Sequence, residues 1–217
     1  SCAGGERNII NIPIEWKDAS TEKEAFELIV TGLKGGHSGM EIDKGRANSN
    51  KIIGRVLNRL SKEVKFDLYH IEGGSKPNAI PRYAIAKVAI STDEYERANE
   101  IIIKLNNEFK KELIHSDKDI VIELKRIDEG LEKVFSDDTK NKVITALNLI
   151  PYGVQTMSMA IKGLVESSNN LGVVKSYDNH ITLESAIRSS VGSLKQFISE
   201  QIELIAQAIG ASFVRIS

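Results

Sequence analysis

The residues most able to do chemistry lie in one stretch, Gly-Leu-Lys-Gly-Gly-His-Ser-Gly at positions 32–39. Four glycines in eight residues indicate backbone that turns sharply or lets a neighbour approach closely. His37 lies inside this turn, and histidine is the side chain whose charge changes near neutral pH. Two interpretations follow: a turn that presents His37 to a ligand, or a tight strand-to-helix connection whose exposed histidine has no function.

Two known glycine motifs do not fit this stretch. A nucleophile elbow needs a glycine two residues on either side of its serine, whereas Ser38 has Gly36 before it and Met40 after it. A phosphate-binding loop needs Gly-Lys-Ser or Gly-Lys-Thr at the start of a helix, whereas Lys34 precedes the paired glycines. The sequence therefore favours neither a serine hydrolase site nor a nucleotide-binding loop.

The histidines and the cysteine do not form a metal-binding motif. His70-Ile71-Glu72 matches half of a zinc deaminase motif, but a single cysteine, Cys2, cannot supply the Cys-x-x-Cys half. His37 and Glu41 are four residues apart, but the second histidine of His-Glu-x-x-His is missing. Since a zinc site needs three or four converging ligands, we expect no metal site in this chain.

Two further side chains could bind a substrate. Asn78 lies in a loop, residues 72–81, that contains two prolines and two glycines, and its amide could donate to and accept from a peptide group. Alternatively, Asn78 bonds its own backbone. Arg188 lies near the end of an expected strand, where its guanidinium could hold a carboxylate at two points. Alternatively, Arg188 is a surface residue paired with Glu184 on the same face.

The hydrophobic pattern predicts an α+β fold. In the first half, strand, helix, strand, strand, helix and strand are expected around residues 25–33, 47–60, 64–68, 84–90, 98–109 and 120–127. This order is typical of a ferredoxin-like antiparallel sheet covered by helices. The second half repeats the order in part, with helices at 143–150 and 191–209, strands at 163–177 and 180–189, and a last strand after 210. We therefore expect a ferredoxin-like first lobe at 1–135, which holds the His37 loop, and a second α/β lobe at 136–217.

Composition narrows the possible partners. The 217 residues include 29 Lys and Arg and 30 Asp and Glu, so a net charge of -1 favours neither nucleic acid nor an anionic membrane as a partner. No apolar run approaches the ~20 residues of a membrane-spanning helix. The chain begins without methionine and ends inside an expected strand, which predicts a piece of a longer protein.

Four motifs resemble a known family. The stretches at 32–39 with 45–51, 73–82, 169–174 and 187–189 resemble, in this order, the lid segment of bacterial aminoacyl-histidine dipeptidases. These are di-zinc metallopeptidases related to carnosinase, aminoacylase and tripeptidase T. Cys-Ala-Gly-Gly at 2–5 is similar to the junction where such enzymes leave their catalytic domain.

The resemblance implies that the metal ions and the substrate-binding side chains lie in two different domains of the enzyme. Two zinc ions and a glutamate base would lie in a catalytic domain absent from this chain, which would bind no zinc and be inactive alone. His37 would hydrogen-bond the scissile carbonyl oxygen as it becomes an oxyanion, an interaction worth ~3 kcal/mol of barrier. Asn78 and Arg188 would hold the peptide group and the terminal carboxylate of an aminoacyl-histidine-type dipeptide. The parent enzyme would be a cytoplasmic homodimer joined through its lid.

An alternative is a freestanding ferredoxin-like module that binds a small ligand or oligomerises without catalysis. Native termini at residues 1 and 217 would favour this module, whereas flanking metal-binding motifs in the parent gene would favour the lid.

Overall fold

A computed structural model describes residues 4–217, so Cys2 and Ala3 of the junction motif lie outside the described residues. The helices are α1 (Ser49–Ser61), α2 (Tyr95–Glu112), α3 (Asp137–Leu149) and α4 (Gly192–Ile209), with short 3₁₀ turns η1 (Ile42–Lys44) and η2 (Thr92–Glu94). The strands are β1 (Gly4–Pro13), β2 (Trp16–Asp18), β3 (Lys23–Thr31), β4 (Gly36–His37), β5 (Asp67–Gly73), β6 (Ala79–Ile80), β7 (Ala84–Ser91), β8 (Val121–Arg126), β9 (Lys133–Phe135), β10 (Gly153–Met157), β11 (Val165–Ser176), β12 (His180–Ser189) and β13 (Ser212–Ile216).

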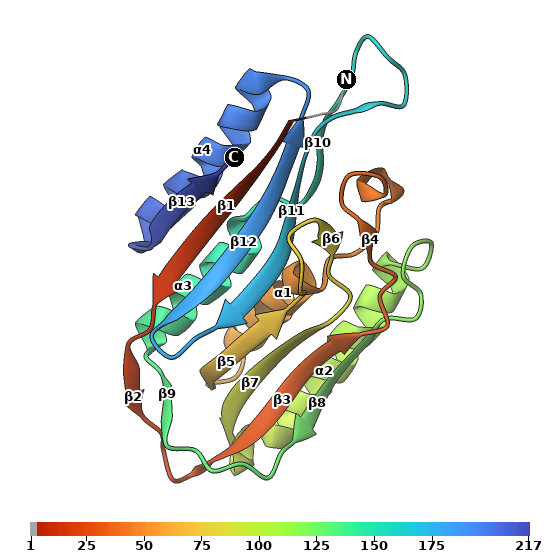
Figure 1. The fold of residues 1–217 in the computed structure, drawn as a ribbon. Coiled ribbons are helices and arrows are strands. Elements are labelled where there is room, and N and C mark those ends of the chain that lie inside the picture. Colours follow the sequence, from red (N-terminus) through yellow and green to blue (C-terminus); the bar gives the residue numbers. More distant parts are fainter. Residues whose placement is uncertain (1–3) are drawn as a thin grey trace.

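The first half forms what we call the inner unit: β3, α1, β5, β7, α2 and β8 (Figure 1). In the sheet these strands follow the order β8-β3-β7-β5, which is fourth, first, third and second along the chain. All neighbouring pairs are antiparallel. This is the ferredoxin-like arrangement, and it confirms the fold class that the sequence predicts.

The remaining long elements form a second copy of the same topology, which we call the outer unit: β1, α3, β11, β12, α4 and β13. Its sheet order, β13-β1-β12-β11, is again fourth, first, third and second. The inner unit is thus inserted between the first strand and the first helix of the outer unit. β1, which the sequence does not predict as a strand, lies in the predicted lobe 1–135 but pairs with β12 and β13. The boundary at 135/136 stays a prediction.

The two units join into one sheet through β5 and β11, where Gly73 pairs with Val174 and Glu72 with Lys175. Their first helices, α1 and α3, also pack together, and Gly54 permits this because an added Cβ would lie 2.6 Å from Cβ of Leu147.

Two lysines tie the paired helices at opposite ends. Lys51 of α1 donates to the carbonyls of Leu147, Asn148 and Ile150 at the end of α3, where a cation also suits the helix dipole. Lys140 of α3 donates to the carbonyl of Phe66, which follows α1, at 2.7 Å. Burial lowers the pKa of Lys51 to about 8, so the ammonium stays charged at neutral pH and has protons for all three carbonyls.

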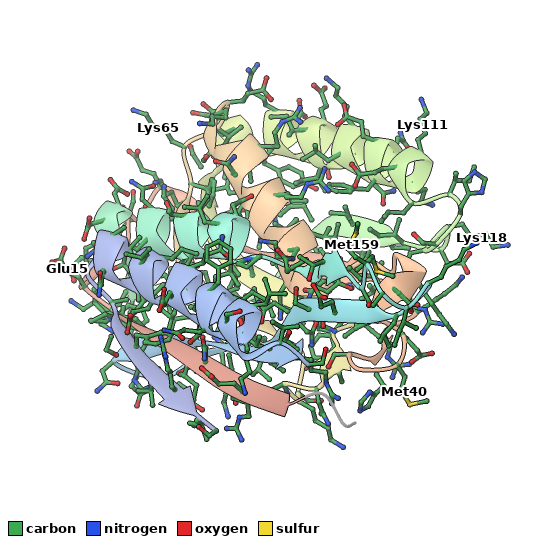
Figure 2. All side chains as sticks on the ribbon, turned by 90° about the horizontal axis from the view of Figure 1, so that it is seen from above. Glu15, Met40, Lys65, Lys111, Lys118 and Met159 are labelled. Carbon is green, nitrogen blue, oxygen red and sulfur yellow. The ribbon has the colours of Figure 1, made fainter. Side chains whose placement is uncertain are left out.

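One continuous core lies between the sheet and the helices. Seen from above, the four α-helices cover one face of the sheet (Figure 2). Apolar side chains alternate along the strands and repeat along the helices so that one face of each element is buried; Phe26, Leu57, Leu68 and Ile181 are fully buried examples from both units. No helix among residues 4–217 has the length and apolar character needed to cross a membrane.

Candidate functional site

The glycine loop is held against the Asn78 loop at one end of the sheet. β4, which contains His37, pairs with β6, so that Gly36 lies opposite Ile80 and His37 opposite Ala79 (Figure 1). The N–H of Ser38 also donates to the carbonyl of Asn78 at 2.9 Å. Two motifs that are forty residues apart in sequence therefore form one small two-stranded sheet.

The loop glycines are needed because side chains from elsewhere occupy the space where Cβ atoms would lie. Gly35 (φ +65°) lies against the side chain of Arg82, and Gly36 (φ +144°) against the Glu41 carboxylate and the Arg46 guanidinium. A Cβ on Gly39 would lie 2.5 Å from Nη1 of Arg188. The predicted close approach of neighbours to this turn is thus confirmed, and charged side chains are among them.

The His37 side chain is exposed and its ring is fixed by the loop itself. The N–H of Gly39 donates to Nδ1 of His37 at 3.0 Å. A ring nitrogen that accepts a hydrogen bond carries no proton, so the proton of the neutral ring lies on Nε2. Within the described part of the chain Nε2 has no hydrogen-bond partner, so it presents an open donor.

The backbone around His37 is held by an ion pair. Oε2 of Glu41 accepts from the His37 N–H at 2.7 Å, while Oε1 accepts from Nη1 of Arg46 at 2.9 Å. Arg46 also donates to the carbonyl of Gly35 at 2.6 Å. The hydrogen bond from His37, together with the nearby Arg46 charge, lowers the pKa of Glu41 below its ordinary value. Glu41 and Arg46 are site residues that the sequence analysis did not identify.

The Asn78 loop is held in place by contacts with β11 of the outer unit. Nδ2 of Asn170, buried in β11, donates to the carbonyls of Pro77 at 2.9 Å and Ala79 at 2.8 Å. Gly172 lies at a bulge in β11, where a Cβ would lie 2.6 Å from Cα of Pro77. The Asn78 side chain itself is exposed and, among residues 4–217, forms no hydrogen bond, so the alternative that it bonds its own backbone is wrong.

Arg188 reaches the site from the outer unit. It lies near the end of β12, opposite Gly5 of β1, and its guanidinium contacts the His37 loop at Gly39. The alternative pairing with Glu184 is wrong, because Glu184 binds Arg7 at 2.6 Å. Arg188 forms no ion pair with any described residue and lines, with Asn78, an open depression of about 500 Å³. A guanidinium and an amide thus face the same space.

A buried asparagine network beneath these loops was also missed by the sequence analysis. Asn48 caps α1 by accepting from the N–H groups of Asn50 and Lys51, and its amide donates to Asn170 and to the carbonyl of Leu171. Asn50 donates to the carbonyls of Gly73 and Leu171. An asparagine before an amphipathic run is a recognisable cap signal. The hydrogen bonds from Asn48 to β11 depend on the tertiary structure and cannot be predicted from the local sequence.

The other histidines lie apart from this site. His70 approaches Glu72 at 3.6 Å, His180 bonds Asn179, and His115 is exposed beyond the end of α2. Across residues 4–217, no three His, Cys, Asp or Glu side chains converge as metal ligands would.

Comparisons with known proteins identify relatives. Residues 30–117 match the model of the peptidase dimerisation domain. The chain is 32% identical over 210 residues to a cytosol non-specific dipeptidase of Escherichia coli, covering 97% of this chain and 43% of that protein. A crystal structure of aminoacylhistidine dipeptidase from Vibrio alginolyticus superposes with a TM-score of 0.96 at 33% identity, covering 100% of this chain and 44% of that one. The chain therefore spans less than half the length of these relatives.

Proposed function

We propose that the chain is the lid of a dipeptidase, because residues 30–117 match the model of the peptidase dimerisation domain and the whole chain matches part of an aminoacylhistidine dipeptidase. The lid would close over a dipeptide held by a separate catalytic part and supply three binding groups. The observation that supports this proposal is that the His37 loop lies against both the Asn78 loop and Arg188, while Asn78 and Arg188 line one depression. Among residues 4–217, Nε2 of His37 and the side chains of Asn78 and Arg188 form no hydrogen bond, so all three are free to bind a substrate.

Each group suits a different part of a dipeptide. Hydrolysis adds water across the peptide bond, and negative charge develops on the carbonyl oxygen before the amine leaves. The Nε2–H of His37 would donate to that oxygen, in a position worth ~3 kcal/mol of barrier. The Asn78 amide would bond the peptide group, and Arg188 would hold the terminal carboxylate at two points. Closure of the lid would exclude water around these contacts.

Zinc does not fit the side chains of residues 4–217. Nδ1 of His37 already accepts a backbone hydrogen bond, and no three His, Cys, Asp or Glu side chains of this range come together as metal ligands. We therefore assign the two zinc ions expected from the resemblance to the catalytic part and derive no step through them. The 217-residue chain alone is expected to have no peptidase activity.

Self-association and location are part of the same proposal. The matching family is a dimerisation domain, so we propose a homodimer joined through the lid. Because β5 and β11 already pair within one chain, that contact would use other surfaces. Light scattering on the chain distinguishes a monomer of 24.0 kDa from twice that mass. We propose a cytoplasmic location because the name of the E. coli relative places that protein in the cytosol.

The test is His37→Ala in the longer protein that contains this lid, assayed on an aminoacyl-histidine dipeptide. We expect turnover to fall about 10²- to 10³-fold with zinc content and folding intact, because one oxyanion donor is removed. His180→Ala is the matched control, because His180 lies opposite Pro13 at the other end of β12 from Arg188. Unchanged turnover in His37→Ala would overturn the catalytic role and favour a ligand-binding module.

A further inference from the structure

We propose that Glu41 and Arg46 are positioning residues that fix the His37 backbone and aim its Nε2–H at the substrate. This inference rests on the proposed carbonyl-binding role of His37. Neither residue needs to touch the substrate, because each acts through the loop that carries the histidine.

Glu41 bonds both backbone groups of His37, its N–H and its carbonyl. Its side-chain Oε2 accepts from the His37 N–H at 2.7 Å, and its own backbone N–H donates to the His37 carbonyl at 2.9 Å. As in one half of a capping box, a glutamate side chain reaches back to the backbone N–H of the residue that begins the turn. Because the carboxylate is charged, its hydrogen bond to the amide is stronger than one between neutral groups.

Arg46 connects this turn to the body of the protein. Its Nη1 bonds both Oε1 of Glu41 and the carbonyl of Gly35, so it spans the loop from one end to the other. Its backbone carbonyl accepts at 2.7 Å from the hydroxyl of Tyr152, which lies just before β10, a strand that pairs with β11 of the outer unit. The Arg46 and Glu41 side chains are only 20% and 28% exposed, so solvent screens their ion pair less than a pair on the open surface.

The same turn sets the direction of the ring. With the loop closed, the Gly39 N–H reaches Nδ1 at 3.0 Å and leaves the proton on Nε2. If the Glu41 bond is lost, Gly39 and His37 move relative to each other and the ring can rotate or change tautomer. A displacement of about 1 Å at a catalytic group costs on the order of 10²-fold in rate.

The first experiment measures kcat and KM of Glu41 variants in the longer protein. We expect Glu41→Ala to lower kcat about 10- to 100-fold with a smaller change in KM, since the donor is misplaced rather than the substrate lost. Glu41→Gln, which keeps an oxygen acceptor but loses the ion pair, should lose only about fivefold. Asp43→Ala is the matched control, because Asp43 is an exposed carboxylate two residues from Glu41 and its side chain forms no hydrogen bond or ion pair within residues 4–217.

NMR of the 217-residue chain is the second half and needs no activity. Ring ¹⁵N shifts of His37 above pH 7.5 should show the Nε2–H tautomer in the wild type and in Asp43→Ala, and a mixture in Glu41→Ala. A mixture in the wild type, or an unchanged pattern in Glu41→Ala, would overturn the positioning role. If His37→Ala leaves turnover unchanged, the proposed function fails and the NMR result still decides whether Glu41 orients the ring.

Discussion

The inner and outer units share one topology but differ in what connects their first strand to their first helix. In the inner unit this connection is the glycine loop with His37, followed by the Asn48 cap of α1. In the outer unit the same connection contains the entire inner unit and ends at the Ser136 cap of α3. The shared fold thus provides a rigid sheet and paired helices, while the chemistry depends on loops that the topology leaves free to vary.

The packing of α1 against α3 should make the largest contribution to holding the inner and outer units together. Gly54→Ala places a Cβ 2.6 Å from Leu147 and should lower the free energy of unfolding by up to about 3 kcal/mol, because the helices must separate. Urea unfolding of the chain measures this loss. Gly192→Ala, at the start of α4 with open space around it, is the control. Equal stability of the two variants would mean that the helix pair does not hold the units together.

Lys51 and Lys140, which link the two units at opposite ends of the helix pair, should contribute unequally to stability because they donate to different numbers of carbonyls. Lys51→Met leaves three carbonyls of α3 without their donor and should cost about 2 kcal/mol, whereas Lys140→Met removes one hydrogen bond and should cost about 1 kcal/mol. Thermal or urea unfolding of both variants gives the order. A larger loss of stability in Lys140→Met than in Lys51→Met would contradict the prediction, because the hydrogen bonds of Lys51 would then contribute less than that of Lys140.

Gly39 tests whether the site needs both units in contact. Gly39→Val pushes the Arg188 guanidinium away from the His37 loop, so turnover of the longer protein should fall about tenfold, or ~1.4 kcal/mol. The KM for the dipeptide should rise, since Arg188 is proposed to bind the carboxylate. Gly130→Val, in open space, should leave both constants unchanged. Normal kinetics in Gly39→Val would remove Arg188 from the site.

Acid should weaken the inner unit through one buried carboxylate. Burial raises the pKa of Asp67, but its bonds with Lys23 at 2.8 Å and Lys17 at 3.2 Å outweigh burial and lower it below 3.8. Because the folded pKa lies below the unfolded one, this contribution is fully present above pH 3.8 and is lost as the pH falls through the folded value. The stability advantage of the wild type over Asp67→Asn should therefore shrink in acid, by at most ~1.4 kcal/mol per pH unit. A difference that is constant from pH 7 to pH 2 would contradict this assignment.

Local sequence patterns determined most of the inner unit. Alternation in 25–30 and 84–90 predicted β3 and β7, and apolar spacing predicted α1 and α2, as it also predicted α4 of the outer unit. The four motifs indicated a resemblance to bacterial dipeptidases, and the comparisons confirm that the chain is similar to part of such enzymes. These signals are short-range, because helix and strand periods repeat within one element.

Only the tertiary structure decided how the site is assembled. β1 escaped prediction because its buried face combines Asn8 with Ile10 and Ile12, so the apolar residues do not alternate regularly with polar ones. It becomes a strand by pairing with β12 and β13, more than 160 residues away. The pairing of Glu184 with Arg7 and the contact of Arg188 with Gly39 depend on the same long-range register. The sequence alone determined which loops could carry chemistry. Their meeting at one point required the sheet, since register between distant strands is set by packing of the whole core and not by local pattern.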